Sequence, residues 1–351
     1  MIKEILEEPL VIRRTILEEQ ENIKQIANKI KTENYEIIYM TGSGTSYHAG
    51  LVSQYVLSSL TGLTTNTILA SEFQRWIPPS LQRKTLLIAI SQSGESTDVI
   101  DAVKAALKRG IDVLAITNTP GSTLARLANY AIFPRSGMEV AVPATKTYIT
   151  QLMTVFMLSI EMVASKGYTK NIEILREKLY DVPNIIEEIF RLNREIIRES
   201  AKRYSNKNLI FVLGSGPNYA TALEAALKLK ETCMVFAEGF AAREFLHGPI
   251  RLVDERTLMI LIAPSDEISD YVSLGRSFKS FGAGVLSILE KTGESDILAR
   301  ISDDVFYIPY GLPKIFSPMI FIVPIQLFTY YMSVFKGLNP DRPEKLVKVV
   351  K

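Results

Sequence analysis

The chain has 351 residues, 47% of them hydrophobic and 22% charged, and this length and composition predict a water-soluble protein of two domains. Its 40 basic and 38 acidic residues leave a formal net charge of +2, which argues against a nucleic-acid or membrane partner. One cysteine, Cys233, excludes an internal disulfide, and with only two histidines the chain has too few zinc ligands, so we expect no metal and no cofactor. The lone cysteine and an N-terminus without a long apolar run indicate a cytoplasmic protein without a signal peptide.

Strands alternate with helices along the first half of the chain, a pattern that predicts a parallel sheet covered by helices on both faces. Residues 1–34 are amphipathic and predict one or two helices before the sheet. Strands are expected at 35–40, 86–90, 113–117 and 131–133. Helices are expected after the first two of these strands, and a long apolar helix over 147–165.

The second half of the chain repeats the first at a constant spacing of 172 residues. The matching positions are Gly42 and Gly214, Thr85 and Thr257, and Gly110 and Gly282. Three matches at one spacing predict a tandem duplication of one α/β domain of the flavodoxin or Rossmann type, each copy a parallel sheet flanked by helices. We expect the first copy over 35–165, a charged helical connector over 166–200, the second copy over 201–336, and a C-terminal tail over 337–351.

One segment of the second copy is long enough to span a membrane, because no charged residue lies between Lys314 and Lys336. Pro318, Pro324 and several polar residues interrupt it, and nothing else in the chain is typical of a membrane protein. A helix buried between domains or subunits is therefore the preferred interpretation.

A phosphate site is predicted where the strand over 86–90 ends in Ser91-Gln-Ser-Gly-Glu-Ser96. Ligands gather at the carboxyl ends of parallel strands, and the N–H groups at the start of the following helix favour an anion. The alternative is a simple helix cap, but a cap needs one hydroxyl and this loop has three. Ser46 follows the first strand and should lie beside the loop.

The two copies differ at this loop. The second copy has Ala263-Pro-Ser-Asp-Glu-Ile268 there, which loses hydroxyls, gains one acid and disfavours an anion. The glycine turns Gly42-Ser-Gly44 and Gly214-Ser-Gly216 both lack the third glycine of a dinucleotide-binding fingerprint. The first copy is therefore expected to bind phosphate and the second to contribute something else.

Candidate chemical groups cluster in the second copy and in the tail. Glu224, Lys228 and Glu231 are spaced to share one helix face, for which a solvated, salt-bridged surface is the alternative interpretation. His247 lies in a loop-like segment, whereas His48 lies inside a predicted helix and is expected to be structural or peripheral. The tail supplies several amines.

Together these segments resemble one family of proteins with two tandem sugar-isomerase (SIS) domains. The matching motifs are Gly44-Thr-Ser-Tyr47, Ala70-Ser-Glu-Phe73, Ser91-Gln-Ser-Gly-Glu95, Ala222-Leu-Glu224, Ala226-Leu-Lys-Leu-Lys-Glu231, His247-Gly-Pro249 and Val323-Pro-Ile-Gln-Leu327. From about residue 35 to the end, the chain is similar to the isomerase half of glutamine–fructose-6-phosphate amidotransferase.

The resemblance implies a role for each matching residue. The sugar phosphate would be held by Thr45, Ser46, Ser91, Gln92, Ser93 and Ser96, the last standing where the synthase usually has threonine. Val142 and Ala144 would line the substrate, although Pro143-Ala144 replaces an Ala-Ser pair. Glu231 would move a proton between C1 and C2, assisted by Lys228. His247 would open the sugar ring, in a homodimer at the neighbouring subunit's site, and Lys348 would form a Schiff base with the open-chain ketose.

The chain departs from that synthase at its start, because Met1-Ile2 provides no cysteine nucleophile and only some 34 residues precede the first strand. We therefore expect no glutaminase activity. The resemblance then implies a deaminase that interconverts glucosamine 6-phosphate with fructose 6-phosphate and ammonia, without a metal. The alternatives are ammonia-dependent or partner-fed synthesis, a fructosamine-6-phosphate deglycase, and a non-catalytic sugar-phosphate sensor.

Overall fold

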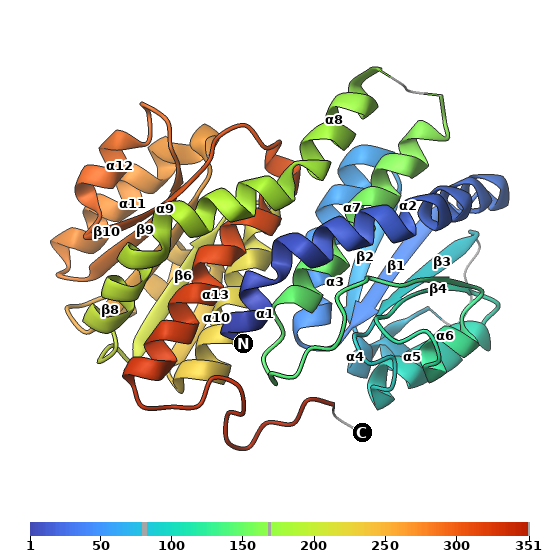
Figure 1. The fold of residues 1–351 in the computed structure, drawn as a ribbon, viewed down its shortest axis with the longest axis horizontal. Helices are drawn as coiled ribbons and strands as arrows, with labels where there is room; N and C mark the ends of the chain where they lie inside the picture. The colour runs from blue at the N-terminus through green and yellow to red at the C-terminus, as the bar shows by residue number, and fades with distance from the viewer. Residues whose placement is uncertain (79–82, 168–169, 350–351) are drawn as a thin grey trace. The chain divides into compact units, whose positions relative to one another are not determined.

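The structure, a computed structural model, describes residues 1–78, 83–167 and 170–349. It forms two compact units that interleave along the chain (Figure 1). Unit 1 comprises Met1–Leu6, Val140–Pro143 and Asn184–Leu346, and unit 2 comprises Glu7–Glu139, Ala144–Pro183 and Val347–Lys351. The domain boundaries drawn from the sequence stay a prediction.

Unit 2 is built on a parallel sheet with strand order β2-β1-β3-β4-β5. Its strands are β1 (Ile37–Gly42), β2 (Thr64–Leu69), β3 (Thr85–Ile90), β4 (Asp112–Ile116) and β5 (Tyr130–Ile132). Its helices are α2 (Glu8–Glu33), α3 (Thr45–Thr61), α4 (Ala70–Trp76), α5 (Thr97–Leu107), α6 (Thr123–Leu127), α7 (Lys146–Ala164) and α8 (Lys170–Tyr180). Every residue of β3 is buried, as its unbroken apolar run predicts for a central parallel strand.

Unit 1 carries a second parallel sheet, in the order β10-β9-β8-β6-β7, which has the same topology read from the other edge. Its strands are β6 (Leu209–Gly214), β7 (Phe236–Ala241), β8 (Thr257–Ala263), β9 (Gly284–Glu290) and β10 (Asp304–Ile308). Its α-helices are α1 (Ile2–Leu6), most of α9 (Val182–Arg203), α10 (Pro217–Cys233), α11 (Ile268–Ser280), α12 (Asp296–Ile301) and α13 (Pro318–Phe335). Short 3-10 turns are η1 (Glu244–His247), η2 (Pro249–Leu252), η3 (Ser265–Glu267) and η4 (Lys314–Phe316).

The duplication predicted from the sequence is confirmed element by element. Strands β1 and β6, strands β2 and β7, and helices α3 and α10 have bounds displaced by the same 172 residues. Strand β1 runs two residues further than expected, because it pairs with β2 as far as Gly42 and Leu69. Strand β2 was not predicted, because it is a partly exposed edge strand whose polar residues Thr64-Thr-Asn-Thr67 give no apolar alternation.

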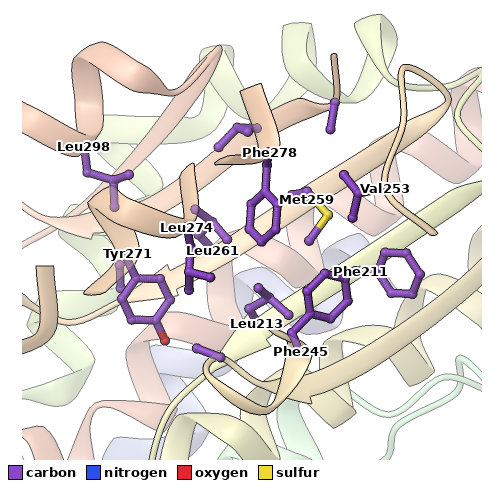
Figure 2. Close-up of a cluster of buried hydrophobic side chains, with 14 of the residues drawn as sticks. Phe211, Leu213, Phe245, Val253, Met259, Leu261, Tyr271, Leu274, Phe278 and Leu298 are labelled. Carbon is purple, nitrogen blue, oxygen red and sulfur yellow. The ribbon is translucent and has the colours of Figure 1, made fainter. Parts of the chain in front are cut away.

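The core of unit 1 fixes the turn that carries His247. Figure 2 shows Phe245 of η1 among side chains from β6, β8 and α11. Its ring centroid lies 5.1 Å from that of Phe211 and 5.7 Å from that of Phe278. Phe245 is fully buried, so η1 is anchored two residues before the histidine.

Two helices are long and apolar enough to cross a membrane, namely Lys146–Ala164 and Lys314–Phe335. In their most apolar stretches 89% and 83% of the residues are buried inside the protein, which is what core helices of soluble proteins show. The uncharged segment is therefore a buried helix, as its prolines and polar residues had indicated. In unit 1, α13 packs beside α10, and Cys233 Sγ donates a hydrogen bond to the Thr329 carbonyl at 3.3 Å (Figure 1).

Candidate active site

The serine-rich loop of unit 2 lies at the point where the strand order reverses. Strands β1 and β3 are parallel neighbours, so both end at the same edge of the sheet. Helix α3, with Thr45 and Ser46 in its first turn, begins just after β1, and the loop over 91–96 follows β3 directly. The crevice between two such strand ends is where doubly wound sheets bind ligands.

The loop is held in shape by its own hydroxyls. Ser91 Oγ accepts the Gly94 N–H at 3.1 Å, and Ser93 Oγ accepts the Glu95 N–H at 3.2 Å. Gly94 has a φ of +66°, and a Cβ atom there would lie 2.2 Å from Ser122 Oγ, so only glycine fits. Gln92 is half-buried, and its carbonyl accepts the Asn118 N–H at 3.1 Å.

The alternative interpretation, that the serines simply cap the helix, is not supported at Ser96, the expected capping residue. Ser96 is the N-cap residue of α5, yet its side chain accepts no capping hydrogen bond. Its hydroxyl and the N–H groups of the first turn of α5 therefore lack the pairing that a capping serine provides. Such a helix start, beside the hydroxyls of Ser91 and Ser93, is suited to an anion.

The tail lysine is paired with a carboxylate that the sequence analysis did not single out. Lys348 Nζ lies 2.7 Å from Glu139 Oε2, and the Glu139 side chain has no exposed surface. Glu139 also accepts the Thr145 N–H at 2.8 Å and the Thr147 hydroxyl at 2.7 Å, at the start of α7. The Lys348 side chain is 24% exposed, whereas its partner is fully buried.

A second charged cluster lies on α10 of unit 1. Lys228 Nζ is 2.5 Å from Glu231 Oε2 and 3.4 Å from Glu224 Oε1. The side chains of Lys228 and Glu224 are each 1% exposed, whereas that of Glu231 is 20% exposed. The interpretation of these residues as a solvated surface is therefore wrong. Glu231 is the partly exposed member of the cluster, and its carboxylate is paired with the buried ammonium of Lys228.

The remaining predicted residues take up varied positions. His247 ends η1 on the exposed surface of unit 1, and His48 is half-buried in α3 beside Tyr47. Val142 lies in unit 1, where its N–H is bonded to the Asp341 carbonyl at 2.9 Å. Ala144 lies in unit 2, next to the N-cap residue of α7.

The corresponding strand ends of unit 1 are surrounded by side chains that pair with one another. Ser215, in the glycine turn after β6, is hydrogen-bonded to the Tyr271 hydroxyl at 3.1 Å, and burial raises the pKa of this tyrosine. Lys314 pairs with Asp266 at 2.9 Å and also with Glu267, which stand where the first copy has Gly94 and Glu95. The expected difference between the copies has a structural counterpart here, because Asp266, which replaces Gly94, forms an ion pair with Lys314.

Two polar residues of unit 2 were missed from the sequence. Glu139 lies in an irregular segment with no motif around it, so local sequence gave no signal. Gln151 interrupts the apolar helix α7, and its amide donates to Ser46 Oγ at 3.1 Å. A lone amide within an apolar helix was the available signal, because burying an unpaired amide is costly.

Comparison with known proteins agrees with this geometry. A profile of the SIS domain matches residues 33–161 and again residues 203–336. Glutamine–fructose-6-phosphate aminotransferase (isomerizing) of Thermococcus kodakarensis is 37% identical over 353 residues, which cover all of this chain and 57% of that protein. The chain thus spans little more than half the length of the curated relatives it matches.

Solved structures show the same architecture. The C-terminal domain of glucosamine-fructose-6-phosphate aminotransferase from Francisella tularensis superposes with a TM-score of 0.89 at 26% identity, covering 98% of this chain and 97% of that one. Glucosamine-6-phosphate deaminase from Thermotoga maritima gives a TM-score of 0.80 at 24% identity, covering 99% and 98%. At that identity the second likeness shows the fold alone.

Proposed function

The chain belongs to the SIS domain family, and from that premise we propose that it is a metal-independent sugar-phosphate isomerase that interconverts glucosamine 6-phosphate with fructose 6-phosphate and ammonia. The observation that carries the proposal is the ion pair on α10, in which buried Lys228 holds the partly exposed Glu231 at 2.5 Å. An aldose–ketose isomerase needs a carboxylate base within reach of the substrate, and the buried ammonium of Lys228 fixes the position of that carboxylate.

The phosphate would bind at the loop over 91–96. Ser91, Ser93 and Ser96 supply hydroxyls there, Gln92 adds an amide, and Thr45 and Ser46 start the neighbouring helix. The uncapped start of α5 supports this role, because its N–H groups and the Ser96 hydroxyl are suited to phosphate oxygens. Val142 and Ala144 are proposed to line the sugar.

Proton transfer is assigned to Glu231. In the open-chain amino sugar, Glu231 removes the proton from C2 and returns it to C1, assisted by Lys228, which holds the carboxylate, and the proton that the C2 amine loses passes to the C1 oxygen. This converts the C1 aldehyde to an alcohol and the C2 amine to an imine. His247 is proposed to open the sugar ring beforehand. Its exposed position is consistent with a role in the active site of a second copy of the chain in a homodimer.

Release of ammonia is assigned to Lys348. Its neutral amine attacks the C2 imine and expels ammonia, leaving a Schiff base between the lysine and the sugar. Water then hydrolyses this bond to fructose 6-phosphate and the free amine, so that one water is consumed for each ammonia released. Glu139 is in contact with the lysine at 2.7 Å and is proposed to accept the proton that the ammonium must lose before attack.

Synthesis in the opposite direction is the second candidate. It is favoured by the name of the Thermococcus kodakarensis relative, an aminotransferase that is 37% identical across the whole of this chain. The same residues would serve, since an enzyme cannot fix the direction of an equilibrium. Free ammonia or a glutaminase partner would then supply the nitrogen.

The deciding experiment supplies purified protein with glucosamine 6-phosphate, without glutamine and with a chelator present. Ammonia and fructose 6-phosphate should appear in equal amounts, and fructose 6-phosphate with ammonium chloride should yield the amino sugar. If neither direction proceeds, fructosamine 6-phosphates are the next substrates, which would identify a deglycase. Tight binding of sugar phosphates without any turnover would overturn the enzymatic proposal and leave a sensor.

A further inference from the structure

The hydrogen bond between Gln151 and Ser46 leaves the amide oxygen of Gln151 unsatisfied within the part of the chain that the structure describes. Gln151 Nε2 donates to Ser46 Oγ at 3.1 Å, and the two residues are 3% and 9% exposed. The amide oxygen Oε1 of Gln151 is buried and has no hydrogen-bond partner among the described residues. Because an orphaned buried acceptor destabilises the fold, an apolar side chain of the same size would suit position 151 better for stability.

The direction of this hydrogen bond determines what Ser46 can still do. A hydroxyl has one donor and two acceptor positions, and the Gln151 N–H occupies an acceptor position. The single O–H of Ser46 therefore remains available for another acceptor. A phosphate presents acceptors only, so a serine that binds it must have its own O–H free.

We propose that Gln151 is a positioning residue for the sugar phosphate, which orients Ser46 so that its O–H is donated to a phosphate oxygen. The inference rests on the proposed function and extends it to a residue that does not itself touch the substrate. It explains why an amide is kept inside an apolar helix at a cost in stability.

Helix α7 carries residues that contact both Ser46 and Glu139. Thr147 and Gln151 are one turn apart and share a face of the helix. Thr147 donates to Glu139 Oε2 at 2.7 Å, the oxygen that holds Lys348, while Gln151 holds Ser46. One rigid element thus orients the group proposed to bind phosphate and the pair proposed to form the Schiff base.

The test compares Gln151→Met, Gln151→Glu and the matched control Ser159→Ala. Ser159 is a fully buried residue on the same helix, and its hydroxyl donates to the Val155 carbonyl of that helix at 2.8 Å. Binding of fructose 6-phosphate and inhibition by inorganic phosphate are measured together with Tm. Gln151→Met should weaken both phosphate readouts about tenfold or more without lowering Tm, because a hydrogen bond to a charged group is lost and an orphaned acceptor is removed. Gln151→Glu should bind phosphate more weakly still, because its carboxylate would accept a hydrogen bond from the Ser46 O–H and leave that group unavailable to the phosphate.

A double-mutant cycle with Ser46→Ala completes the test. If Gln151 acts through Ser46, Gln151→Met should have no further effect on binding in the Ser46→Ala background. Equal phosphate binding by Gln151→Met and Ser159→Ala overturns the inference and leaves the proposed function standing, as does a clear loss of Tm with unchanged binding. Wild-type protein that binds fructose 6-phosphate no better than fructose overturns the proposed function itself.

Discussion

Lys348 and Glu139 lie 209 residues apart in the chain, yet their side chains form an ion pair with Nζ 2.7 Å from Oε2. The carboxylate is fully buried and also receives a backbone N–H and a hydroxyl from the start of α7. The lysine is thus paired with a carboxylate whose position is fixed by burial and by its other hydrogen bonds. For Lys348 as the proposed nucleophile, this carboxylate is the proposed acceptor of the ammonium proton.

Glu139→Gln should slow Schiff-base formation at Lys348, because the amide cannot accept the ammonium proton. We expect the adduct with fructose 6-phosphate, trapped by borohydride and measured by mass spectrometry, to form at least tenfold more slowly. Lys348→Arg should abolish trapping, and Lys345→Arg, an exposed neighbour, should leave it unchanged. Wild-type trapping rates in Glu139→Gln would remove the proposed role of Glu139.

Glu231→Gln should lower kcat at least a hundredfold, because the base that moves the proton between C1 and C2 is lost. Binding of fructose 6-phosphate should change little, since the phosphate is assigned to unit 2. Glu238→Gln, at an exposed position of β7, is the control and should retain activity. Substantial turnover by Glu231→Gln would require another base.

Gly94→Ala should destroy phosphate binding, whereas Gly110→Ala should not. Both glycines have positive φ, +66° and +71°, so both substitutions cost about 1 kcal/mol of backbone strain. Only at Gly94 does the added Cβ meet other atoms, with Ser122 Oγ at 2.2 Å and Thr117 Oγ1 at 2.8 Å. Calorimetric titration with fructose 6-phosphate should separate the two variants, and equal affinities would show that the loop does not bind the ligand.

Cys233 should make the protein less stable at high pH. Burial raises the pKa of its thiol from 9.0 to about 11. Between these values the unfolded chain loses this proton while the folded chain keeps it, so the free energy of unfolding falls as pH rises through that window. Tm measured from pH 8 to 11 should fall less steeply for Cys233→Ala than for wild type. The native thiol should also resist alkylation at pH 8, and rapid labelling there would contradict its burial.

The duplicated α/β fold was predictable because its signals are local. Apolar runs of strand length, helix periodicity and glycine turns occur twice at one spacing, and each copy repeats the same strand order. The serine loop after β3 was predictable for the same reason, since a strand, a polar turn and a helix are contiguous in the chain. Edge strand β2 escaped because half-exposed polar residues carry no clear period.

Burial and distant pairing were decided by the tertiary structure. The spacing of Glu224, Lys228 and Glu231 places them on one helix face but does not say what packs against that face. The structure shows that Glu224 and Lys228 are buried and that Glu231 is partly exposed. Gln151 reaches Ser46 across 105 residues, and Glu139 reaches Lys348 across 209. Side-chain partners so far apart leave no periodic trace in a single sequence. The sequence therefore determined the repeated α/β pattern and the place of the serine loop, because these signals are local. The folding of the elements against one another determined which charged side chains are buried and which partners they have.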